Sequence, residues 1–179
     1  MNFDYNDEQK ALKDEARRFL SSVSPLTAVR AVLDSPGQGH DPAIWARIGE
    51  QGWCGAAVPE QYGGIGMGYV ELCALAEELG RALVPVPFAS TVYLFAEALM
   101  QAGSEAQKAE LLPRLCSGGL IGAVAVSERP GALSHIETRF ENGKLTGVKL
   151  PVADGLDQRH EEEPRREGHR PRARVGGEA

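Results

Sequence analysis

Hydrophobic residues recur at helical spacing through the first two thirds of the chain. Between residues 7 and 22 they follow one stripe, and Asn6 or Asp7 can cap its start. A second helix is predicted to open at Asp41 and Pro42, because proline is favoured in the first turn of a helix. The stretch between them, residues 34–40, is rich in glycine, serine and proline and therefore predicts a loop.

The helix predicted at residues 69–81 is amphipathic, with an apolar face toward the core and glutamates in solvent. The apolar face comprises Val70, Cys73, Ala74 and Leu79, and the solvated glutamates are Glu71, Glu77 and Glu78. Pro85 and Pro87 follow and stop this helix. Residues 89–102 are apolar on nearly all sides, which predicts a central helix. A fifth helix starts at the capping-box pair Ser104 and Gln107.

After Gly118 the hydrophobic pattern changes from helical to strand spacing. The short apolar run at residues 120–126 is bounded by glycine and favours a buried strand. Asn142-Gly143 separates two further segments, 136–141 and 144–149, and is the strongest short hairpin signal.

Helices followed by strands predict an α+β fold with two structured parts. The first is an all-α helical domain at residues 1–118, and the second is a part with predicted strands at residues 119–155. Residues 156–179 form a tail with six Arg, six acidic residues and only four aliphatic residues. This tail cannot bury enough apolar surface to order itself, so we predict that it is disordered.

Charge and composition exclude several classes of protein. A net charge of -6 argues against nucleic acid as a partner, because phosphate contacts need clustered Lys and Arg. The acidic start MNFDYNDEQ is unlike a secretory signal, and no apolar run approaches the roughly 20 residues of a membrane span. We therefore predict a cytoplasmic protein without a membrane span.

Few residues suggest chemistry by themselves. Three Cys without a CxxC pair and four His without metal spacing predict reduced thiols and no metal site. Glu77 and Glu78 fit a solvated helix face better than an acid–base pair, and no catalytic dyad is visible. Trp45 and Trp53 are predicted to anchor the helical core.

Two polar or glycine-rich motifs have alternative interpretations. Gly64-x-Gly66-x-Gly68 resembles a dinucleotide-binding turn, but no good strand precedes it, which favours a tight loop between helices. Ser127 and Glu128 end the predicted strand, where they can either contact a ligand or only terminate the strand. The sequence leaves this second choice open.

Two longer stretches carry a family resemblance. VPEQYGGIGMGYVELCALAEELGR (residues 58–81) and GSEAQKAELLPRLCSGGLIGAVAVSE (residues 103–128) resemble signature segments of the acyl-CoA dehydrogenase family. The resemblance extends from residue 1 to about residue 155. It implies an N-terminal helical domain, a middle β-domain and a C-terminal four-helix domain, so that residues 119–155 are the start of an incomplete middle β-domain.

The resemblance also implies an activity, a cofactor and partners. Members of the family oxidise an acyl-CoA thioester to the 2,3-enoyl product, with a Glu as base and FAD as hydride acceptor. They form homo- or hetero-oligomers and pass electrons to an electron-transferring flavoprotein. No catalytic residue is assigned here, because the family's catalytic Glu lies in the C-terminal domain.

The resemblance assigns four residues to FAD. Val126 and Ser127 match positions that contact the flavin, and Ser134 matches a phosphate-binding serine. Val152 lies in the segment where the family has Lys-x-Trp-Ile-Thr-Asn-Gly. This chain has Lys149-Leu-Pro-Val-Ala-Asp-Gly155 and so lacks the aromatic and hydroxyl side chains of that motif.

The departures from the family pattern lead to alternative hypotheses. Arg-rich, Lys-free sequence follows residue 155 abruptly, which predicts a truncation or a shifted reading frame. The chain is then an incomplete dehydrogenase, a non-catalytic partner subunit of a heteromeric dehydrogenase, or an inactive gene remnant.

Overall fold

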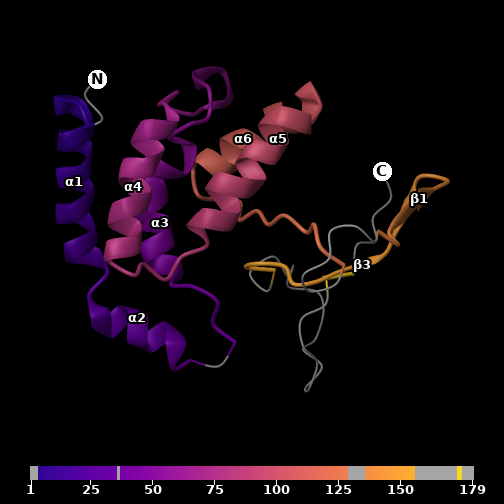
Figure 1. The fold of residues 1–179 in the computed structure, drawn as a ribbon, viewed down its shortest axis with the longest axis horizontal. Helices are drawn as coiled ribbons and strands as arrows, with labels where there is room; N and C mark the ends of the chain where they lie inside the picture. Colours follow the sequence, from indigo (N-terminus) through magenta and orange to yellow (C-terminus); the bar gives the residue numbers. More distant parts are fainter. Residues whose placement is uncertain (1–3, 36, 129–135, 156–172, 175–179) are drawn as a thin grey trace.

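A computed structural model describes residues 4–35, 37–128, 136–155 and 173–174. Their helices come first and their strands afterwards, which confirms the predicted α+β order (Figure 1). The helices are α1 (Asp7–Val23), α2 (Leu26–Leu33), α3 (Pro42–Glu50), η1 (Trp53–Gly55), η2 (Glu60–Tyr62), α4 (Tyr69–Arg81), η3 (Ala89–Phe95), α5 (Ala96–Ala102) and α6 (Glu105–Cys116). The strands are β1 (Arg139–Glu141), β2 (Lys144–Thr146), β3 (Val148–Lys149) and β4 (Ala173–Arg174).

Side-chain caps fix the starts of three helices. Asn6 and Ser104 form capping boxes with Gln9 and Gln107, and Asp41 accepts hydrogen bonds from the first turn of α3. These starts confirm the sequence predictions for α1, α3 and α6. The sequence analysis missed α2, whose N-cap is Pro25 without a side-chain cap.

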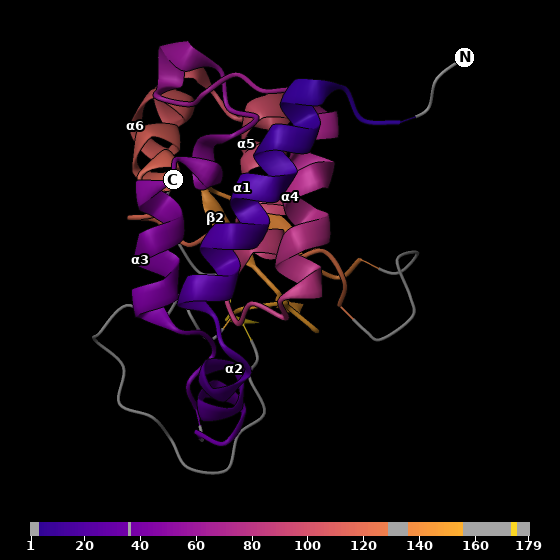
Figure 2. The ribbon, with the colours of Figure 1, turned by 90° about the vertical axis from the view of Figure 1, so that its left-hand side faces the viewer.

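The helical core forms where α1 lies along α4, as Figures 1 and 2 show from two directions. Trp45 and Trp53 are both buried in this core, as predicted, and the ring of Phe19 meets Trp53 edge to face at 5.1 Å. A second cluster, around Leu112, forms between α6, α5 and the loop at Val58.

The faces of α4 differ in part from the prediction. Ala74 and Leu79 are buried as expected, but Val70 and Cys73 are exposed. Their places in the core are taken by Leu72 and Leu75. Glu78, predicted to be in solvent, is only 1% exposed. Arg17 of α1 pairs with this buried carboxylate and neutralises its charge.

The fourth predicted helix is neither continuous nor fully surrounded. Residues 89–95 form a π-helix, η3, which passes directly into α5. Leu94 is 51% exposed, so this segment has a solvent-facing side rather than the central position that its composition predicted. The wider π turn is a rare conformation that is frequently found at functional sites.

The predicted buried strand at residues 120–126 is not a strand. This segment is extended, but it has no ladder partner in the described part of the chain. The hairpin is confirmed, since β1 and β2 are antiparallel with Phe140 opposite Leu145 around Asn142-Gly143. β3 pairs with β4, and the other residues of the predicted tail lie outside the described residues.

The glycine-rich loop between η2 and α4 is confirmed as a tight connection. A Cβ at Gly64 would lie 1.9 Å from the carbonyl oxygen of Val58, so only glycine fits there. The loop follows a 3₁₀ turn rather than a strand, which contradicts a dinucleotide-binding turn. In the described ranges, no helix is long and apolar enough to cross a membrane.

Candidate functional site

The π-helix η3 holds the extended segment that follows α6. The Thr91 hydroxyl is fully buried, accepts the N–H of Gly122 at 3.1 Å and lies 3.3 Å from the Gly122 carbonyl oxygen. A Cβ on Gly122 would lie 2.2 Å from the Phe95 ring. The backbone therefore approaches η3 more closely than any residue type other than glycine would allow. The Thr91 side chain therefore makes the hydrogen bonds to Gly122 that a neighbouring strand would make in a sheet.

A second anchor connects η3 to the segment beyond β3. The buried Ser90 hydroxyl lies 2.5 Å from Asp154 Oδ2. Asp154 has a left-handed backbone conformation, with φ of 53°, which Asp tolerates better than most residues. Neighbouring residues of η3 therefore hold two segments that are about 30 residues apart in sequence.

Glu128 lies at the centre of a third set of contacts. Its Oε1 accepts hydrogen bonds from the N–H and hydroxyl of Thr138, at 2.8 and 2.5 Å, and pairs with Lys149 Nζ at 2.9 Å. Its Oε2 accepts the N–H of Glu137. The hydrogen bonds from Thr138, Glu137 and Lys149 lower the pKa of Glu128 to about 2. Its carboxylate is thus committed to partners within the chain.

Three of the four residues predicted to bind FAD lie on neighbouring segments. Val126 is 56% exposed, and Ser127 and Val152 are half-buried. The Leu150 N–H donates to the Ser127 carbonyl oxygen at 2.7 Å, which places residues 126–128 beside the segment that carries Val152. Ser134 lies outside the described residues.

The contacts made by Thr91, Ser90 and Glu128 were not anticipated from sequence. A glycine inside an otherwise apolar run, Gly122, was the available signal for a close backbone approach. The sequence left the role of Glu128 open between ligand contact and strand end. The structure instead gives it internal partners.

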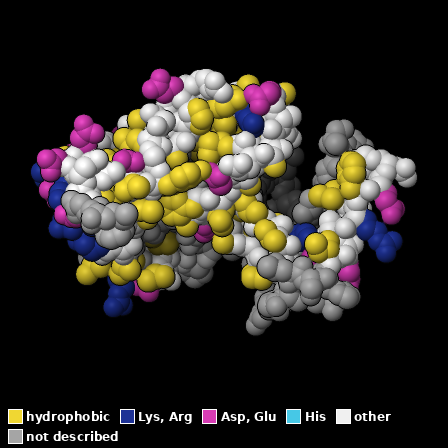
Figure 3. Space-filling view, turned by 45° about the horizontal axis from the view of Figure 1, so that its top comes forward, with side chains coloured by type: hydrophobic (Ala, Val, Ile, Leu, Met, Phe, Trp, Pro, Cys, Tyr) yellow, Lys and Arg dark blue, Asp and Glu magenta, His cyan; other side chains and the backbone are white. Residues whose placement is uncertain are grey.

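An apolar cavity of about 320 Å³ lies between α4 and the η3–α5 helix. Tyr93 lines it, and burial raises the pKa of Tyr93 to about 12. The hydroxyl of Tyr69 donates to Glu97 at 3.0 Å, and both residues also line the cavity. Figure 3 shows that apolar side chains also spread over the surface of the helical part.

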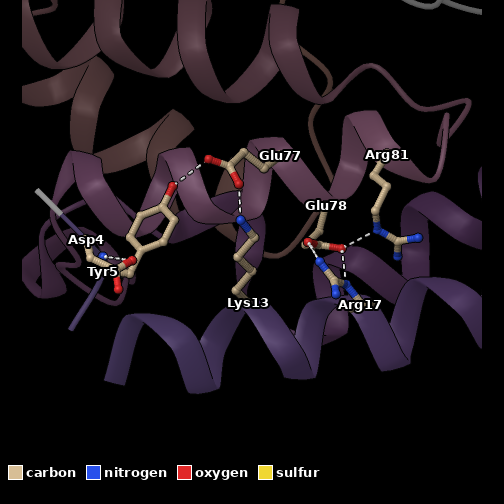
Figure 4. A network of polar contacts seen from close by, with 7 residues as sticks. All are labelled: Asp4, Tyr5, Lys13, Arg17, Glu77, Glu78 and Arg81. Carbon is tan, nitrogen blue, oxygen red and sulfur yellow. Dashed lines mark hydrogen bonds and ion pairs between the residues drawn. The ribbon is translucent and has the colours of Figure 1, made fainter. Parts of the chain in front are cut away.

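The two adjacent glutamates of α4 are held in ion pairs with α1, as Figure 4 shows. Glu77 binds Lys13 and the hydroxyl of Tyr5. Glu78 binds Arg17 at 2.8 Å and Arg81 at 2.6 Å. Both carboxylates therefore hold α4 against α1 rather than facing a ligand. In the ranges that the structure describes, no group of three or more His, Cys, Asp or Glu could hold a metal ion.

Comparisons with known proteins agree on one family. The family model for the N-terminal domain of acyl-CoA dehydrogenase matches residues 6–119, well over half of the chain. The chain therefore belongs to the acyl-CoA dehydrogenase family. It is 32% identical over 162 residues to the mitochondrial isovaleryl-CoA dehydrogenase of Pongo abelii, with 85% of this chain and 38% of that protein covered.

Solved structures share the fold. A chain of the ChsE4-ChsE5 complex from Mycobacterium tuberculosis has a TM-score of 0.70 and 27% identity, covering 84% of this chain and 39% of that one. An acyl-CoA dehydrogenase complexed with FAD from Bacillus anthracis has a TM-score of 0.71 and 25% identity, covering 83% and 27%. The chain thus spans well under half the length of these relatives.

Proposed function

We propose that this chain supplies the N-terminal helical domain and the first flavin-contacting segments of an FAD-dependent acyl-CoA dehydrogenase. The observation that carries the proposal is the pairing of residues 126–128 with residues 149–152 through the Leu150–Ser127 hydrogen bond, next to a family-matched helical domain. The substrate is an acyl-CoA thioester, and the electron acceptor is an electron-transferring flavoprotein.

The residues present fit part of a flavin site. Val126 offers an exposed apolar side chain, Ser127 a hydroxyl, and Val152 a second apolar contact on the neighbouring segment. When bound, FAD would accept the hydride that acyl-CoA oxidation releases. We assign no base within the described residues, since Glu77, Glu78 and Glu128 are all held by hydrogen bonds or ion pairs.

Visible absorbance of the purified chain with added FAD tests this proposal. We expect a retained flavin band after gel filtration. Bleaching of that band by an acyl-CoA mixture under anaerobic conditions would show that the complete reaction takes place. A chain that retains no flavin at any FAD concentration would contradict the proposal for the chain alone.

A partner-subunit role is the second candidate. It is favoured by Pro151 and Ala153, which replace the aromatic and hydroxyl side chains of the family motif, and by the similarity to a chain of the two-protein ChsE4-ChsE5 complex. Co-expression with a full-length family member tests it. Flavin that co-purifies only with the pair favours the partner role, whereas a chain that never associates contradicts it.

A further inference from the structure

We infer that Glu128 is a positioning residue that fixes the flavin-contacting segment 126–127 against the segment that carries Val152. This inference rests on the proposed function and extends it to a residue whose carboxylate is held by partners within the chain. It follows from three features of the site: the enclosure of the carboxylate, the separation of its partners along the chain, and its place next to Ser127.

The carboxylate of Glu128 is enclosed although Glu128 lies in an otherwise open part of the molecule. Its side chain is 7% exposed, and that of its ion-pair partner Lys149 is 12% exposed. Hydrogen bonds to a charged acceptor are stronger than those between neutral groups, and an enclosed charge depends on them. Loss of this carboxylate would therefore leave Lys149 and two backbone N–H groups without their acceptor.

The partners of Glu128 come from both ends of the β1–β2 hairpin. Glu137 and Thr138 precede β1, and Lys149 ends β3. One carboxylate thus joins the start of the hairpin to the segment that follows it. Since β1 and β2 are mostly exposed and pair over three residues, they have little apolar packing to hold them in place.

Glu128 is also adjacent to the residues that it positions. The Ser127 carbonyl accepts the Leu150 N–H at 2.7 Å, and Lys149 and Leu150 are consecutive. The two contacts therefore join the same pair of segments side by side. Groups that orient a binding residue without contacting the ligand affect affinity through geometry. By this route Glu128 sets the spacing between Val126–Ser127 and Val152.

Two variants and a matched control test the inference in the full chain. Glu128→Ala removes every acceptor, whereas Glu128→Gln keeps one carbonyl oxygen and loses the ion pair. Glu141→Gln changes an exposed carboxylate on the same hairpin and serves as the control. The first readout, made without FAD, is amide hydrogen exchange by NMR at Glu137, Thr138 and Leu150. The second is FAD affinity together with the shape of the visible flavin band.

We expect Glu128→Ala to speed exchange at these amides by about tenfold or more. FAD should bind about tenfold more weakly or worse, the range seen when residues that orient metal ligands are removed. Glu128→Gln should lie between wild type and Glu128→Ala, and Glu141→Gln should match wild type. The unfolding of the helical part should not change in any variant.

Each contrary outcome identifies which step is wrong. Unchanged exchange in Glu128→Ala overturns the inference, because the carboxylate then holds nothing. Faster exchange with unchanged FAD affinity and an unchanged flavin band also overturns it, because the hairpin then does not set the cofactor site. A wild-type chain that binds no FAD overturns the proposed function, while the exchange data still decide whether Glu128 joins the two segments.

Discussion

The helical part and the segment after Gly118 are held in place by different forces. Among the described residues, every buried hydrophobic side chain lies at or before Cys116. Beyond that point Ile121 is partly buried against the helical core, and polar contacts of Gly122 and Asp154 attach the chain to η3. Glu128 joins segments that all lie beyond Gly118. Burial scales with apolar area and is spread over many residues, whereas each polar anchor depends on a few atoms. The candidate cofactor segments therefore depend on single side chains.

Removing apolar volume from the helical core gives the largest expected effect. Leu75 is fully buried between α4 and its neighbours, so Leu75→Ala should lower the free energy of unfolding by about 2–5 kcal/mol. Urea denaturation followed by circular dichroism measures this loss. Leu33→Ala is the matched control, since Leu33 is 75% exposed and should change stability by less than about 0.5 kcal/mol. Equal losses in the two variants would contradict the core described above.

The contact between η3 and the segment after Gly118 should be weakened by adding one methyl group. Gly122→Ala places a Cβ against the Phe95 ring, which cannot move without disturbing η3, so we expect a loss of about 1–3 kcal/mol. Gly80→Ala is the matched control in α4, where a Cβ meets nothing within 4 Å. That change should stabilise the protein by up to about 1 kcal/mol. Thermal unfolding of both variants measures whether the two changes in stability have opposite signs. If Gly122→Ala unfolds at the same temperature as wild type, the close approach of Gly122 to Phe95 is excluded.

An ionic contact inside the helical part gives a pH-dependent effect. The hydrogen bond from Arg17, supported by Arg81, lowers the pKa of Glu78 to about 2, although burial acts in the opposite direction. The ordinary value is 4.5, so this carboxylate stabilises the fold above pH 4.5, and its contribution disappears as the pH falls toward 2.

Glu78→Gln should therefore cost on the order of 1 kcal/mol at pH 7, a value reduced because both arginines are about half exposed. The difference from wild type should shrink as the pH falls from 4.5 toward 2. Urea denaturation at several pH values measures it, with the exposed Glu50→Gln as control. A constant difference across this range would mean that the ion pairs do not contribute.

The sequence predicted the helical part well because its signals are local. Caps at Asn6, Asp41 and Ser104 and the amphipathic spacing of α4 identify helix starts from neighbouring residues alone. The failures have two causes: α2 lacks a side-chain cap at its start, and the burial of Glu78 depends on a partner that is distant in sequence. Glu78 can be buried because Arg17, which lies 61 residues earlier in the sequence, pairs with its carboxylate. No pattern within α4 indicates that contact.

The candidate site was predictable only in its approximate location. Asn142-Gly143 indicated the hairpin, and the family resemblance indicated residues 126, 127 and 152, whose role in FAD binding remains a prediction. The anchors could not be predicted, because Thr91 and Gly122 meet through a side chain rather than through a strand ladder. The alternation that indicates strands carries no information about such a contact.

The smallest expected effect on global stability comes from the anchor at Asp154. Asp154→Ala removes the contact with Ser90 and places alanine at a positive φ, whereas Asp154→Asn keeps a side-chain acceptor and tolerates that conformation. We expect Asp154→Ala to speed amide exchange in residues 148–155 and to change the free energy of unfolding of the helical part by less than about 0.5 kcal/mol. Asp154→Asn should resemble wild type in both measurements. Since local opening and global unfolding report different parts of a protein, a large loss of helical stability in Asp154→Ala would show that the two regions unfold as one unit.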